Sequence, residues 1–170
     1  MRISSVVIIH VITHGLFYGV ITAGYLLLIM ISFSPRIWGY QDYPEVVKRK
    51  VSAQTKKEKT LAKIVGLPWF VFVAGFPVFS TLALKSKLGG EIPFLTALLN
   101  VLVMFFLATL GDLVLLDWLL ISKITPKFVI IPGSIKEDYK DFSHHFRGHA
   151  KGAILMVILG LIIAGFISWL

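Results

Sequence analysis

The sequence predicts an all-α, polytopic membrane protein with four transmembrane helices, and two properties of the chain lead to this fold class. Of its 170 residues, 56% are hydrophobic and only 15% are charged, and the mean hydropathy is +0.84. A soluble domain of this length needs a more highly charged surface. The apolar residues also form long runs, and a helix of about 20 such residues crosses the hydrocarbon core of a bilayer.

The apolar runs divide the chain into four predicted spans, at residues 4–33, 64–84, 94–122 and 153–170. The first run is too long for the apolar part of a signal peptide and has no convincing cleavage site, so we interpret it as a retained helix. We therefore expect one four-helix domain covering residues 1–170. The chain has no cysteine, which excludes disulfides and thiolate metal ligands.

Small residues recur at every fourth position of the first span, at Gly15, Gly19 and Ala23. Such a ridge allows two helices in a membrane to approach closely. We expect it to serve packing within the bundle, with a homo-oligomer contact as the alternative.

The basic residues indicate how the spans are oriented. Eight of the 17 Lys and Arg lie between positions 36 and 63, and six lie between positions 123 and 151. Cytoplasmic loops carry the excess of positive charge, so loops 35–63 and 123–151 are predicted to be cytoplasmic and both termini to lie outside. The net charge of +8 favours contact with anionic lipid headgroups. Nucleic acid is not an expected partner, because four spans leave no soluble basic platform with interleaved aromatics.

Short helices are predicted in the cytoplasmic loops from three capping-box patterns, at residues 42–45, 55–58 and 134–137. The first pattern predicts a helix that runs to about Val51. The second predicts a helix that continues into the second span. The third predicts a helix that continues into the fourth span and carries Tyr139 and three histidines with it.

Ionisable side chains in or beside the spans are the main functional signal, because each is costly inside a bilayer and is a functional candidate by default. These residues are His10, His14, Asp112, Asp117, His145 and His149. Histidines four apart share a helix face, whereas Asp112 and Asp117 are five apart and would point about 140° apart on an α-helix. We therefore expect the two aspartates to have separate partners, unless a π-bulge intervenes.

Depth along the bundle separates these residues into two groups. At 1.5 Å per residue, Asp112, Asp117 and the later histidines lie toward the cytoplasmic side, and His10 and His14 lie toward the outside. The first group predicts a divalent metal site with Asp112, Asp117, His145 and His149 as ligands, suited to Zn or Fe(II). His10 and His14 are a second candidate pair. Lipid phosphate is expected to contact three further residues. These are Tyr139, Arg147 and Lys151.

One segment, residues 111–152, resembles a small family of prokaryotic integral membrane proteins with four spans. The resemblance is carried by Gly111-Asp112, Asp117-Trp118, Pro126, Ile131-Pro132-Gly133, Tyr139 and His145-Phe146-Arg147-Gly148. It implies a four-helix membrane fold and brings no reaction, substrate or ligand with it.

Three hypotheses for function remain open from the sequence. The first is a membrane-embedded metal site that activates water against a lipid or isoprenoid substrate. The second is a small transporter or channel coupled to protons or ions, because ionisable groups are staggered through the spans. The third is an accessory protein without catalysis. The chain carries no HExxH motif or Gly-rich phosphate loop, so the sequence does not decide whether it is an enzyme.

Overall fold

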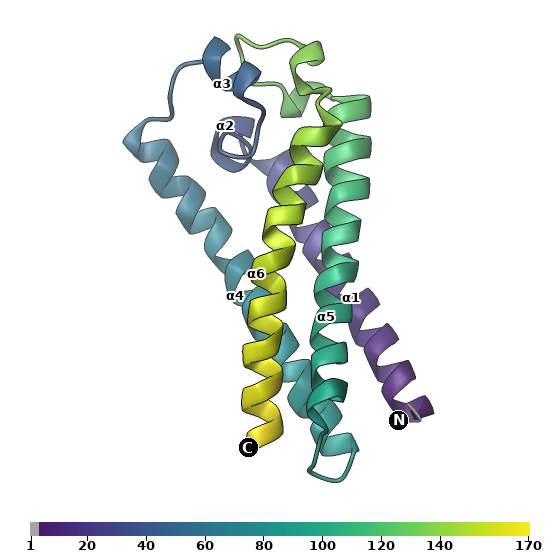
Figure 1. Cartoon of the computed structure of the whole chain (residues 1–170). Helices are drawn as coiled ribbons and strands as arrows, with labels where there is room; N and C mark the ends of the chain where they lie inside the picture. The colour runs from purple at the N-terminus through teal and green to yellow at the C-terminus, as the bar shows by residue number, and fades with distance from the viewer. Residues whose placement is uncertain (1–3) are drawn as a thin grey trace.

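The computed structural model describes residues 4–170, and this part of the chain is helical without any strand (Figure 1). Four of its helical segments are long and apolar enough to cross a membrane. They are α1 (Ser5–Ser32), α4 (Lys56–Lys87), α5 (Phe94–Gly111) with its continuation η1 (Asp112–Ile124), and α6 (Phe142–Trp169). The predicted all-α class with four such helices is confirmed. Helices α4 and α6 begin 8 and 11 residues before the predicted spans, since polar turns precede their apolar parts.

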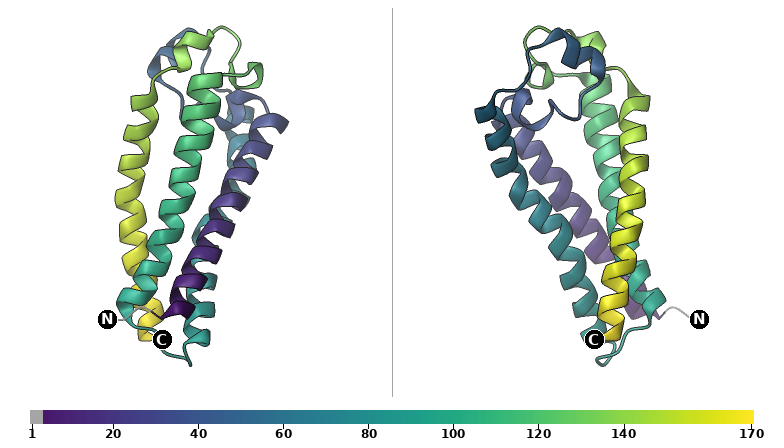
Figure 2. Two further views of the ribbon diagram at one scale, coloured as in Figure 1. Left: turned by 90° about the vertical axis from the view of Figure 1, so that its right-hand side faces the viewer. Right: turned by 60° about the vertical axis from the view of Figure 1, so that its left-hand side comes forward.

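Helix α5 lies between α1 and α6, and glycines set two of its contacts (Figure 2). A Cβ on Gly19 of α1 would lie 3.4 Å from the backbone oxygen of Leu107, and a Cβ on Gly160 of α6 would lie 2.9 Å from Leu102 Cδ2. The small-residue ridge of α1 is therefore used within the bundle, as expected. Gly148 and Gly152 differ, because a Cβ on either would have no neighbour within 4 Å.

Short helices close the end of the bundle opposite the start of α1 and the end of α6 (Figure 1). They are α2 (Pro35–Trp38), α3 (Glu45–Lys50), and the 3₁₀ turns η2 (Lys127–Val129) and η3 (Lys136–Tyr139). Tyr43 and Tyr139 are buried here with their rings edge to face, 4.9 Å apart, and the Tyr43 hydroxyl donates to Val129 O at 2.9 Å. This "capped end" is thus a small packed core that joins the two basic loops.

The predicted capping boxes have different outcomes. The second one is confirmed, since Thr55 accepts from the N–H of Glu58 and the Glu58 carboxylate accepts from Thr55. The first is wrong, although α3 ends at Lys50, next to the predicted end. Helix α3 begins at Glu45 after Pro44 and has no side-chain cap, because Asp42 lies in the turn before it.

The third capping box is also wrong. Ser134 bonds to the hydroxyl of Tyr139, and the N–H of Ile135 donates to Asp138 at the start of the turn η3. The chain then turns, and α6 begins afresh with Asp141 as its N-cap. Tyr139 is consequently not part of the helix that carries the histidines.

Candidate metal centre

The two aspartates of the site lie on the π-helical segment η1, which continues α5 from Asp112 to Ile124. A π-helix bonds each N–H to the carbonyl five residues earlier, as the 2.8 Å bond from Thr125 N to Leu120 O shows at its end. This wider turn places Asp112 and Asp117, five residues apart, on one side of the segment. The expectation that they face apart was therefore wrong, because it assumed the 100° step of an α-helix.

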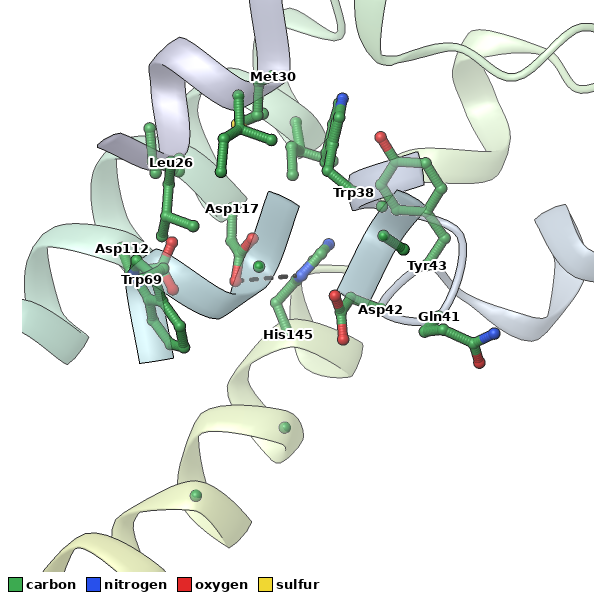
Figure 3. A pocket seen from close by; sticks show the side chains of 18 of the residues that line it. Leu26, Met30, Trp38, Gln41, Asp42, Tyr43, Trp69, Asp112, Asp117 and His145 are labelled. Atoms are coloured by element: carbon green, nitrogen blue, oxygen red, sulfur yellow. Dashed lines mark ion pairs between the residues drawn. The ribbon is translucent and has the colours of Figure 1, made fainter. Parts of the chain in front are cut away.

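Helix α6 supplies the two histidines that meet these aspartates. His149 Nε2 lies 2.8 Å from Asp117 Oδ2 and 3.8 Å from Asp112 Oδ2. His145 Nδ1 lies 3.2 Å from the same Oδ2 atom of Asp117 (Figure 3). His145 and His149 are one turn apart and share a face of α6, as their spacing predicted.

Three of these side chains have the geometry of metal ligands. Asp112, Asp117 and His149 each offer one ligand atom, and these atoms lie within 4.8 Å of one another. Zinc is held by nitrogen and oxygen at about 2.0–2.2 Å, so its ligand atoms lie roughly 3–4 Å apart, and small side-chain shifts would close the group around an ion. Within residues 4–170, no other group of three or more such residues has this proximity.

His145 stands beside this group and contacts it through Asp117. Its Nδ1 faces the carboxylate, and its Nε2 is buried without a hydrogen-bond partner among the described residues. A histidine that donates one ring N–H to a carboxylate keeps its other nitrogen as a lone-pair donor. Of the four predicted ligands, the structure thus brings three together and makes His145 a partner of Asp117.

Asp112, Asp117 and His149, called the metal group below, line a cavity of about 1070 Å³. It is lined by α1, α4, η1, α6 and the capped end, and much of its wall is apolar. Among the lining side chains are Leu26, Met30, Trp69, Phe70 and Met156. This volume accommodates a sizeable ligand with an apolar part.

Asp42 is a pocket residue that the sequence analysis did not assign to the site. Its carboxylate lies in the cavity close to His145 (Figure 3), and its backbone oxygen accepts from His144 Nε2 at 2.9 Å. Desolvation and the negative charge of Asp117 raise the pKa of Asp42 above its ordinary value. The only sequence signal was the Asp42-Tyr43-Pro44 turn, which was interpreted as a helix cap.

The three predicted lipid contacts are placed differently from one another. Tyr139 is fully buried and its hydroxyl is bonded to Ser134 and to Ile131 N, so its assignment as a lipid contact was wrong. Arg147 and Lys151 both line the cavity. Arg147 also lies 3.7 Å from Asp141.

His10 and His14 lie far from the metal group, in the first half of α1 near the end of α4. Their rings stack with centroids 3.8 Å apart, and His10 Nε2 contacts Ser80 O and Oγ at 3.0 and 3.1 Å. His10 Nδ1 lies 3.2 Å from Lys87 Nζ. His10 therefore joins α1 to α4 through hydrogen bonds, whereas His14 stacks on it and has a buried Nδ1 without a partner in the described chain. No carboxylate completes the pair as a metal site within the described residues.

Fold and site together define an all-helical protein with four potential membrane helices and a His/Asp group able to hold a metal ion. Comparison with known proteins finds no matching family model, no matching curated protein and no matching solved structure. The resemblance to four-span proteins thus stays a prediction.

Proposed function

We propose that this chain is a multi-pass membrane protein in which Asp112, Asp117 and His149 bind a divalent metal ion, Zn²⁺ or Fe²⁺, beside a pocket where a lipid-like substrate is hydrolysed. The observation that carries this proposal is the convergence of three ligand atoms within 4.8 Å, from two helices, at the wall of a largely apolar cavity. A divalent ion supplies a Lewis acid and a water of lowered pKa.

Insertion into a membrane is supported by the outer surface of the bundle. Large apolar side chains point outward along the long helices, and Val20, Phe106 and Ile154 are 69%, 62% and 66% exposed. Soluble proteins seldom expose an apolar surface of this extent. The distribution of basic residues supports an orientation with the capped end in the cytoplasm.

The side chains around the metal group have separate tasks in this proposal. His145 holds Asp117 in place through the 3.2 Å contact. Asp42 makes no side-chain hydrogen bond in the described chain and has a raised pKa, so we assign it as the proton acceptor of the pocket.

The transport hypothesis has less support from the packing. Between the two histidine clusters the bundle is filled by buried side chains, among them Tyr18, Val101, Met104 and Phe105. A proton or ion path along the bundle would have to cross this layer.

Metal content is the direct test of the proposal. Detergent-purified protein, stripped with chelator and reloaded with Zn²⁺ or Fe²⁺, is expected to retain about one ion per chain by mass spectrometry. His149→Ala and Asp117→Ala should lose it. Two matched variants, His144→Ala and Asp42→Asn, should keep it, because these residues line the same pocket outside the ligand group. A folded wild-type protein that retains no ion after reloading contradicts the proposal.

A further inference from the structure

Four cationic side chains line the pocket from two facing helices. Lys59 and Lys63 come from α4, and Arg147 and Lys151 come from α6. Each pair is four residues apart, so both members of a pair share one face of their helix. Exposed cationic residues of α4 and α6 thus line one cavity from both helices.

These charges have little compensation within the protein. In residues 4–170 no ion pair involves Lys59, Lys63 or Lys151, and Arg147 has only its 3.7 Å contact with Asp141. The carboxylates of Asp112 and Asp117 pair with histidines instead. An anionic ligand could therefore pair with Lys59, Lys63 and Lys151 without displacing an existing ion-pair partner. Its pairing with Arg147 would compete only with the 3.7 Å contact to Asp141.

The space between the cations is apolar and open. Helix α4 leans away from α6 toward the capped end (Figure 1), and the cavity is lined by both helices along this stretch. Gly148 and Gly152 of α6 leave room on this side, since a Cβ on either meets nothing within 4 Å. Trp69 of α4 also lines the cavity, and its indole N–H is buried without a partner in the described chain.

We propose that the pocket binds a lipid whose headgroup carries a phosphate, with the phosphate held by the four cations and the apolar chain lying between α4 and α6. The proposal deepens the proposed function and rests on it in making this lipid the substrate of the metal site. A neutral lipid would leave Lys59, Lys63 and Lys151 without an ion-pair partner, and a free phosphate would leave the apolar wall unused.

Binding of phosphatidic acid to the purified protein in a neutral detergent tests the headgroup. Lys59→Gln/Lys63→Gln should weaken binding on the order of 25-fold, about fivefold for each charge near the headgroup, as followed by native mass spectrometry. The control Lys56→Gln/Lys57→Gln removes the same charge from the same helix at positions that do not line the cavity, and should bind like the wild type. Equal weakening in both variants, or none in the first, overturns the proposal.

Two further ligands test whether binding requires both the phosphate and the apolar chain. Diacylglycerol and inorganic phosphate are each expected to bind at least tenfold more weakly than phosphatidic acid. Comparable binding of either one overturns the proposal, since the headgroup or the chain would then be irrelevant.

A variant that fills the pocket tests the position of the chain. Gly152→Phe adds a ring where nothing lies within 4 Å of a Cβ, so the fold should persist while binding of phosphatidic acid falls about tenfold. Unchanged binding would place the lipid elsewhere and overturn the proposal. Metal content measured on the same samples keeps the two ideas apart: lipid binding without metal rejects only the proposed metal site, and metal without lipid binding rejects only the lipid proposal.

Discussion

Both histidines of the candidate metal centre contact a single oxygen atom, Oδ2 of Asp117, at 3.2 and 2.8 Å. Asp112 has one such contact, at 3.8 Å from His149. The two aspartates therefore contribute differently to stability when no metal is present. Asp117 organises the histidines, whereas the charge of Asp112 is weakly paired in a partly buried place.

Neutralising the two aspartates one at a time should reveal this difference. In chelator-treated protein, Asp117→Asn is expected to lower the free energy of unfolding by about 2 kcal/mol, since a hydrogen bond to a charged group contributes roughly 1.5–3 kcal/mol. Asp112→Asn should leave it unchanged or raise it. Thermal unfolding in detergent measures both, and an equal loss in the two variants would contradict the asymmetry.

At the scale of residues, the sequence predicted which histidines and aspartates would lie at a common depth, and the structure brings Asp112, Asp117 and His149 together. Counting 1.5 Å per residue was enough to place His149 near Asp112 and Asp117 and away from His14. The position of Asp42 could not be predicted by counting residues along a helix. It lies beside His145 because of how the loop before α3 packs on the rest of the capped end.

At the scale of elements, the π-helical segment η1 decides the geometry of the site. Hydropathy and spacing predicted a helix at residues 94–122, and the structure has one up to Ile124. The sequence does not mark the switch from α- to π-helical hydrogen bonding at Asp112. Both kinds of turn use the same residue types and differ only in which carbonyl accepts the hydrogen bond. Gly111 tolerates such a change but does not require it.

A pair of cysteines can report on this wide turn, because the native chain has none. Asp112→Cys/Asp117→Cys is expected to chelate one Cd²⁺ per chain through both thiolates, with tighter binding than either single variant. Leu102→Cys/Leu107→Cys has the same spacing on the α-helical part of this span and should not chelate intramolecularly, since its members point about 140° apart. Thiolate–cadmium absorbance measures both pairs. Similar titrations for the two pairs would contradict the π-helical geometry.

Helix α1 also approaches the backbone of α5 closely at one small residue, Gly19. Gly19→Leu would push a side chain against the backbone of Leu107 and should destabilise the protein by about 1–3 kcal/mol, the usual cost of overpacking. Gly24→Leu on the same helix meets nothing within 4 Å of its Cβ and should be nearly neutral. Thermal unfolding of the two variants compares them directly, and equal stability would mean that α1 does not pack closely on α5 at Gly19.

At the scale of the whole molecule, the all-α class and the four long helices followed from composition and apolar runs alone. The capped end did not, because its core joins residues far apart in the sequence: Tyr43 donates to Val129 and packs on Tyr139. The capping patterns at residues 42–45 and 134–137 predicted two helix starts there. The structure does not have them, because long-range packing determines the backbone at both positions. Trp38 and Tyr43 of this end also line the pocket, so the packing of the capped end supplies part of the pocket wall.

The orientation of the molecule in a membrane is the last prediction, and it follows from charge and fold together. The start of α1, the end of α6 and the turn between α4 and α5 lie at one end of the bundle, and the basic loops lie at the other (Figure 2). Because cytoplasmic segments carry the excess of Lys and Arg, single cysteines at Glu91 and Leu170 should react with an impermeant maleimide on intact cells. A cysteine at Lys127, in η2 of the capped end, should react only after the membrane is opened. The reverse pattern would place the metal centre and its four cations on the outer side, and the lipid would then have to reach the pocket from the outer leaflet.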